Sequence, residues 1–132
     1  MTTAIDTNVL LDIFLPDPAH AERSAALVER ASEEGALVIC HIVLAELAPL
    51  FPSAERLNGA LERIGIDLSP LDRDVAFAAG QAWRAYRAKG GKRTRILSDF
   101  LIGARALLRA DRLLTRDRGF YRTCFPNLTL LE

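Results

Sequence analysis

The chain has 132 residues, of which 50% are hydrophobic and 26% are charged. This length suits a single domain spanning residues 1–132, which buries roughly two thirds of its unfolded surface without a disulfide or a structural metal. The formal net charge is zero, but residues 1–74 carry 5 basic and 13 acidic side chains, and residues 75–132 carry 12 basic and 4 acidic ones. A basic C-terminal half indicates a nucleic-acid partner. Attraction between the two halves within the fold is the alternative explanation.

The N-terminus has no basic segment followed by an apolar core, and no apolar run reaches the length needed to cross a bilayer. Neither a secretory signal nor a membrane anchor is therefore expected. Cys40 and Cys124 form no CxxC motif and have no zinc-ligand spacing, which is typical of reduced thiols. We expect a cytoplasmic protein that does not associate with membranes.

Strands and helices are predicted to alternate along the chain. Short apolar runs bounded by turn residues predict strands over residues 2–5, 36–40, 65–69, 112–115 and 128–131. Apolar residues at helical spacing predict helices over residues 9–15, from Pro18 to the stop at Gly35, over 41–50, and after the N-cap residues Ser53, Asp72 and Ser98, with a turn or a single helical turn at 117–121. This alternation predicts an α/β fold, a three-layer α/β/α sandwich with a central, mostly parallel sheet.

Four acidic residues stand at positions that matter in such a fold. Asp6 follows the first predicted strand, Asp117 follows the strand that ends at Thr115, Asp99 opens a helix, and Glu46 lies inside an apolar run. Each has an ordinary structural explanation: a helix cap, a turn residue, a complement to the helix dipole, or a partner for a buried arginine. One shared acidic pocket at the carboxyl edge of a parallel sheet explains all four together, and ligands bind at that edge.

Such a pocket has a definite chemistry. Clustered carboxylates raise one another's pKa, and a divalent cation relieves their repulsion. Oxygen ligands favour Mg²⁺, with Mn²⁺ able to substitute, and a bound Mg²⁺ keeps several waters. Activated water beside positive charge is the arrangement required for phosphodiester hydrolysis.

Basic residues flank two of these acids. Residues 75–98, which directly precede Asp99, contain six basic residues and no acidic one. We expect three of them, Lys92, Arg93 and Arg95, to contact an RNA backbone. Arg116 and Arg118, on either side of Asp117, are expected to contact RNA in the same way. A solvated loop without a ligand is the alternative for the stretch that contains Lys92.

These residues lie in segments that resemble the PIN domain family, and in detail the VapC-type toxins of bacterial toxin–antitoxin pairs. The matching segments run in the family's order through nearly the whole chain: Ile5-Asp6-Thr7-Asn8-Val9-Leu10-Leu11-Asp12, Ala45-Glu46-Leu47, Ser98-Asp99-Phe100-Leu101-Ile102-Gly103-Ala104, Leu113-Leu114-Thr115-Arg116-Asp117-Arg118-Gly119-Phe120 and the ending from Phe125 to Leu131. The first and last motifs are fairly specific, and the four acidic positions are all kept. Gly103 departs mildly from the family, which often has alanine there.

The resemblance implies a metal-dependent endoribonuclease that acts as a toxin. Asp6 and Asp99 would be the main Mg²⁺ ligands, with help from Asp117. Glu46 would position water or metal, and these four acids would be the catalytic residues. Asn8 and Thr115 would orient the acids through hydrogen bonds, as the family's matching positions do. A homodimer and a cognate antitoxin that blocks the acidic cleft are also implied.

Two other functions remain open at this point. A PIN-like module could hold RNA or a protein without cutting, although four intact acids disfavour it. A phospho-acceptor signalling domain would also have an acidic metal pocket, but it would need a lysine where Arg116 and Arg118 stand. RNA cleavage in the presence of metal separates the three.

Overall fold

The computed structural model describes residues 1–92 and 97–131. In chain order, the elements of this part are β1 (Thr2–Ile5), α1 (Thr7–Phe14), α2 (Ala21–Glu34), β2 (Ala36–Ile39), α3 (His41–Leu47), the 3-10 helix η1 (Ala48–Leu50), α4 (Ala54–Ile64), β3 (Ile66–Leu68), α5 (Arg73–Ala88), α6 (Leu97–Arg109), β4 (Arg112–Leu114), α7 (Arg118–Cys124) and β5 (Leu130–Leu131). All five predicted strands are present, each near its predicted position. The expected α/β fold with a parallel sheet is confirmed.

Several helix ends follow from single residues that the sequence marks. The Ser53 hydroxyl accepts a hydrogen bond from the Arg56 N–H and caps α4. Asp72 accepts one from the Val75 N–H and caps α5. Gly65 ends α4 in the left-handed conformation (φ 85°), which glycine adopts without steric cost.

Two predicted helix starts are wrong. Helix α2 begins at Ala21 rather than at Pro18, because the Asp17 carboxylate accepts from the Ala19 and His20 N–H groups and closes a separate turn. Helix α6 already includes Leu97, so Ser98 lies within its first turn and does not precede it. Serine is common at the positions on both sides of a helix start, so its presence marks the end only to within a residue or two.

The strand order, β3-β2-β1-β4-β5, with every pair parallel, places the site. The chain runs outward from β1 through β2 to β3, then crosses back to lay β4 on the other side of β1. The point where the direction of winding reverses is therefore the boundary between β1 and β4, where Ile5 is paired with Leu114. At such a point the loops that follow the two strands diverge and leave a crevice at their carboxyl ends.

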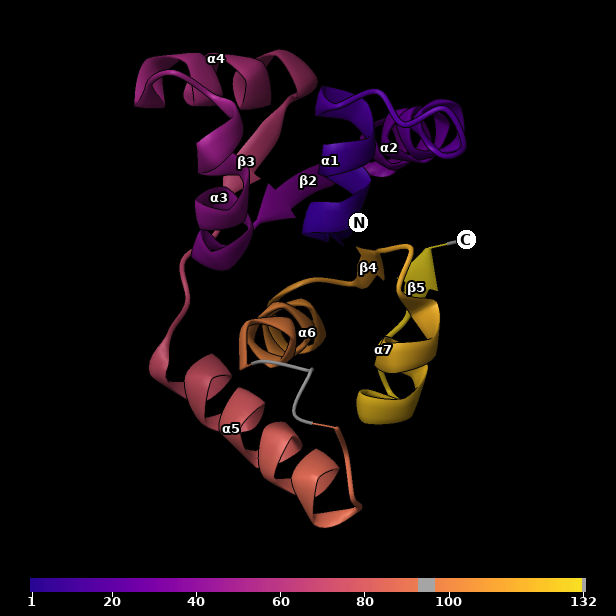
Figure 1. Ribbon diagram of the computed structural model, residues 1–132, viewed down its shortest axis with the longest axis vertical. Helices are drawn as coiled ribbons and strands as arrows, with labels where there is room; N and C mark the ends of the chain where they lie inside the picture. The colour runs from indigo at the N-terminus through magenta and orange to yellow at the C-terminus, as the bar shows by residue number, and fades with distance from the viewer. Residues whose placement is uncertain (93–96, 132) are drawn as a thin grey trace.

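Helices cover the sheet on both faces. In Figure 1, α1, α2 and α4 lie on one side of the strands and α5, α6 and α7 on the other. The apolar core fills the space between these layers, and its largest fully buried side chains are Tyr121, Phe100, Ile5, Leu10, Leu37, Ile39, Leu47, Leu113, Leu114, Val9, Val43 and Val75. None of the helices described is long and apolar enough to span a membrane.

Gly103 allows a close approach between α6 and the segment after α7. A Cβ atom at this position would collide with the buried ring of Phe125. The glycine found where the related family often has alanine thus has a packing reason in this chain.

Candidate active site

Asp6 is held at the junction between β1 and α1. It follows the last residue of β1, and its own N–H donates to the Leu114 carbonyl of β4, 2.9 Å away. Its Oδ1 accepts from the Thr7 N–H at 2.8 Å, which caps α1. Asp6 therefore is a helix cap, as one of the two sequence interpretations holds, and it also lies at the carboxyl edge where the winding of the sheet reverses.

The second oxygen of Asp6 is held by two side chains. Thr115 donates from Oγ1 to Asp6 Oδ2 at 2.7 Å, and Asn8 donates from Nδ2 to the same oxygen at 3.3 Å. The Thr115 hydroxyl also accepts from the Asp117 N–H at 3.0 Å. One hydroxyl thus links the carboxylate that follows β1 to the loop that follows β4.

Burial makes Asp6 an unusual carboxylate. It is only 6% exposed, and burial raises its pKa to about 6 despite the hydrogen bonds from Thr115 and from the Thr7 N–H, with the negative charge of Asp99 raising it further. A buried carboxylate held in place by hydrogen bonds favours either a proton or a cation.

Tyr121 shows that three of the acids converge. Its side chain is 1% exposed, and its pKa is raised by burial and by the charges of Asp6, Asp99 and Asp117. The hydroxyl makes no hydrogen bond of standard geometry within residues 1–92 and 97–131, although it lies close enough to Asp6 to interact with that carboxylate. The acids at the ends of β1 and β4 and at the start of α6 therefore lie near enough to Tyr121 for all three charges to act on its phenol.

Glu46 reaches the same region from α3. Thr7 donates from Oγ1 to Glu46 Oε1 at 2.7 Å, so Glu46 is held by the residue that follows Asp6 in the chain. Glu46 is exposed, and its position in an apolar run does not bury it. The partner is thus a threonine hydroxyl at the start of α1, and no arginine in residues 1–92 and 97–131 pairs with Glu46.

Comparison with known protein families identifies the family of this chain. The PIN domain model matches residues 3–126, almost the entire chain. The chain belongs to the PIN domain family. No curated protein sequence matches it significantly.

Solved structures with the same fold cover the chain from end to end. VapBC2 from Rickettsia felis, bound to a DNA fragment from its promoter, superposes with a TM-score of 0.75 at 23% identity, covering 99% of this chain and 98% of that one. VapBC-1 from nontypeable Haemophilus influenzae gives 0.74 at 18% identity, with 100% and 98% covered. DNA-bound VapBC from Salmonella typhimurium gives 0.65 at 21% identity, with 99% and 97% covered. At these identities the likeness establishes the fold.

The carboxylates of this PIN domain suit a hard cation that keeps its own water. Among the described residues, no three histidine, cysteine, aspartate or glutamate side chains form a ready-made set of metal ligands. Mg²⁺ does not need one, because it commonly takes one or two carboxylates directly and completes its shell with waters. Asp6, whose burial disfavours its charge, and Asp99, whose charge acts on Asp6, are the pair that a cation would stabilise most.

The basic residues predicted to contact RNA lie in different situations. Lys92 is exposed, and its carbonyl accepts from the Tyr86 hydroxyl at 3.1 Å. Arg93 and Arg95 lie outside the described residues. Arg116 is paired with Asp12: its Nε and Nη2 atoms donate to the two oxygens of that carboxylate at 2.7 and 2.9 Å.

Three residues of the site carry no role in the sequence analysis. Thr7 holds Glu46, Asp12 holds Arg116, and the charges of three of the acids act on Tyr121. Thr7 and Asp12 lie inside the first motif, so the sequence could have suggested them as site residues. Tyr121 ends the turn predicted over residues 117–121 and lies one helical turn from Asp117, but no local feature of the sequence shows that the other acids lie near it.

Proposed function

We propose that this PIN domain is a Mg²⁺-dependent endoribonuclease, the toxin of a toxin–antitoxin pair. The observation that carries the proposal is the gathering of Asp6, Asp99 and Asp117 about Tyr121, with Glu46 joined through Thr7, where the sheet winding reverses. Four carboxylates from four separate elements are costly to bring together, and structural roles alone do not require it. PIN family membership and the VapBC neighbours support the same function.

The roles of the residues follow from their surroundings. Asp6 and Asp99 would hold the metal directly, with Asp117 assisting and Glu46 placed to accept a proton from water or to position it. The ion would supply positive charge that lowers the pKa of a water and stabilises charge on the phosphoryl oxygens. Asn8 and Thr115 would orient the acidic side chains that hold the metal.

Asn8 and Thr115 would fix the Asp6 carboxylate before substrate arrives. Both donate to Asp6 Oδ2, and Asn8 Oδ1 in turn accepts from the Arg116 N–H at 3.1 Å. The carboxylate therefore has little freedom to rotate. A ligand held in advance loses less entropy when metal and RNA bind.

The proposed substrate is RNA, and the proposed partners are proteins. Lys92, Arg93, Arg95 and Arg116 would neutralise RNA phosphates on either side of the acids. A second copy of the chain and a cognate antitoxin that covers the acidic cleft are the protein partners, and the cytoplasm is the compartment. The antitoxin part draws on neighbours that are themselves VapBC assemblies.

Cleavage of a mixed cellular RNA pool tests the proposal. Purified protein is incubated with Mg²⁺, with Mn²⁺ or with chelator, beside Asp99→Asn and, as a matched control, Asp67→Asn, an exposed carboxylate on β3. We expect discrete products that require metal, persist in Asp67→Asn and vanish in Asp99→Asn. Salt-dependent binding of RNA without any cleavage would replace the nuclease with a binding module. Cleavage that survives chelator would refute the metal site.

A further inference from the structure

A cavity lies beside the acidic cluster, between α2 and the strands β4 and β5. Its volume is about 250 Å³. It is lined by Val9, His20, Arg23, Ser24, Leu27, Leu114, Thr115, Arg116, Arg118 and Leu131. No acidic residue is among them. Four of the ten can carry positive charge, whereas Val9 and the three leucines form an apolar floor.

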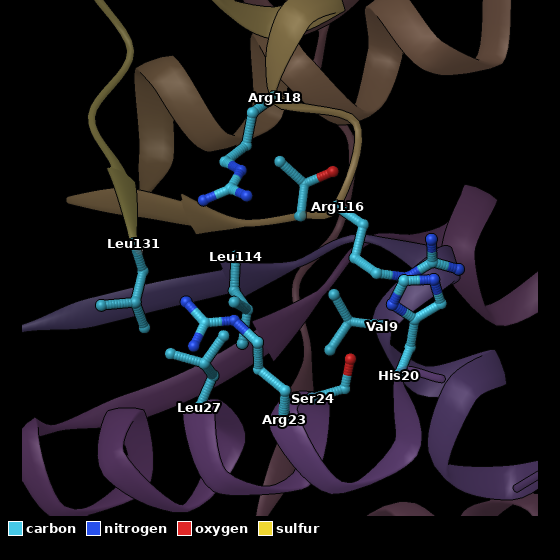
Figure 2. A pocket seen from close by; sticks show the side chains of 10 residues that line it. Val9, His20, Arg23, Ser24, Leu27, Leu114, Arg116, Arg118 and Leu131 are labelled. Carbon is cyan, nitrogen blue, oxygen red and sulfur yellow. The ribbon is translucent and has the colours of Figure 1, made fainter. Parts of the chain in front are cut away.

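Two guanidinium groups give the cavity its charge. Figure 2 shows Arg118, from the start of α7, and Arg23, from the first turn of α2, pointing into the same space from opposite walls. Arg23 has no hydrogen bond or ion pair within the described part of the chain. The charge of Arg116 is balanced by Asp12, which is 3% exposed and also accepts from Ser24 at 2.7 Å. Arg116 therefore adds less net positive charge to the cavity than Arg23 does.

An anion held between two arginine side chains that face one cavity is stabilised by both of their charges. The arginine side chain presents a planar fork of N–H donors that matches phosphate oxygens in pairs. A volume of about 250 Å³ lies just below the range of roughly 300–1,000 Å³ typical of complete ligand pockets. The cavity thus suits one phosphate with the sugar or base attached to it, resting on the apolar floor.

Thr115 connects this cavity to the acidic cluster. Its side chain lines the cavity, and its Oγ1 donates to Asp6 at 2.7 Å. A strand of RNA with one phosphate at Asp6 would therefore bring a neighbouring nucleotide to Arg23 and Arg118 without leaving the carboxyl edge of the sheet.

We propose that Arg23 and Arg118 form a subsite for a backbone phosphate of the RNA substrate, next to the phosphate that is cleaved. This proposal rests on the proposed function and adds to it a specific contact from α2. It differs from the predicted role of the basic stretch that precedes Asp99 in the sequence, because Arg23 and Arg118 belong to other segments of the chain.

Binding in the presence of chelator tests the subsite without cleavage. The affinity of the full chain for a fluorescent single-stranded RNA is measured by anisotropy over a range of salt concentrations. The variants are Arg23→Gln, Arg23→Glu and the double variant Arg23→Gln/Arg118→Gln. Arg56→Gln, an exposed arginine on α4, is the matched control. Arg23 is exposed and makes no described polar contact, so its variants are expected to fold, and thermal melting verifies this.

We expect Arg23→Gln to weaken binding severalfold, and Arg23→Glu and the double variant to weaken it at least about tenfold. The slope of log affinity against log salt should fall by about 0.7, the value for one phosphate on a single strand. Arg56→Gln should change neither quantity. Unchanged affinity and slope in the Arg23 variants, while RNA is still bound and cut, would overturn the subsite and leave the nuclease function standing.

A second probe separates the subsite from the function. Inorganic phosphate at constant ionic strength should raise the melting temperature of the wild type but not of the double variant, because it binds only the folded cavity. If phosphate has this effect but RNA does not bind, the nuclease proposal and the RNA assignment both fail, and an acidic group of a protein partner becomes the occupant. If phosphate has no effect and RNA affinity is unchanged in the variants, no anion site exists here.

Discussion

Replacing Asp6 with asparagine should stabilise the metal-free protein at neutral pH, although it removes the central acid. Burial raises the pKa of Asp6 from its ordinary value of 3.8 to about 6. At 1.36 kcal/mol for each tenfold change, ionising this side chain costs the native state about 3 kcal/mol more than the unfolded state. Asparagine is neutral and nearly the same shape, so it avoids this cost.

The hydrogen bonds reduce the expected gain. Asparagine can still accept from the Thr7 N–H through Oδ1, but its NH₂ group replaces the oxygen that accepts from Thr115 and Asn8. Thr115 Oγ1 can turn to accept instead, whereas Asn8 Nδ2 then faces another donor, a loss of about 1–2 kcal/mol. We therefore expect a net gain of about 1–2 kcal/mol at pH 7.5, or a rise of about 3–8 °C in melting temperature.

The change in stability with pH shows whether burial of the Asp6 charge is the cause. Between about pH 4 and pH 6 the native state binds a proton at Asp6 that the unfolded state has released, so the free energy of unfolding falls as pH rises. The advantage of Asp6→Asn should accordingly appear across this window and disappear near pH 4, where the wild-type carboxyl is also neutral.

Thermal or urea unfolding in chelator, from pH 4 to pH 8, measures this difference. Asp67→Asn is the control, because an exposed carboxylate should give no such trend. Adding Mg²⁺ should stabilise the wild type alone and narrow the gap at neutral pH. A variant that is less stable than the wild type by the same amount at every pH would refute the view that burial of charge dominates at Asp6.

Three further predictions follow from single contacts. Gly103→Ala should destabilise the fold by about 1–3 kcal/mol in urea unfolding, because its methyl group collides with Phe125, and the higher helix propensity of alanine offsets about 1 kcal/mol of packing cost at most. Tyr121→Phe removes a buried hydroxyl without a good partner, so the melting temperature in chelator should stay equal or rise; a clear fall would reveal a hydrogen bond to the acids. Asp12→Asn should cost about 1–2 kcal/mol at pH 7. Burial alone would raise the pKa of Asp12, but the hydrogen bonds and charge of Arg116 lower it below 3.8, so this contribution is fully present at neutral pH and shrinks as pH falls below about 4. A cost that does not shrink with falling pH would contradict it.

Local features of the sequence were enough to predict most elements and two of the site positions. Apolar runs and caps depend on residues a few positions apart, and so Ser53 and Asp72 mark helix starts correctly. The alternation of strands and helices predicts a parallel sheet, and in a parallel sheet Asp6 and Asp117 must follow strands at the same edge. Those conclusions need no knowledge of which strands are neighbours.

The tertiary structure decided what lies next to what. Only the strand order places β4 beside β1, which brings Thr115 to Asp6 and Asp117 to the same crevice. Pairing of Arg116 with Asp12, across more than one hundred residues, likewise has no local signal.

The exposure of Glu46 and the cavity shared by Arg23 and Arg118 also have no local signal in the sequence. Propensity and periodicity act over one or two turns of chain, whereas these contacts depend on how whole layers pack. The sequence by itself thus determined which elements form and which acids stand at their ends, and the packing of the sheet with its helices determined which side chains meet there.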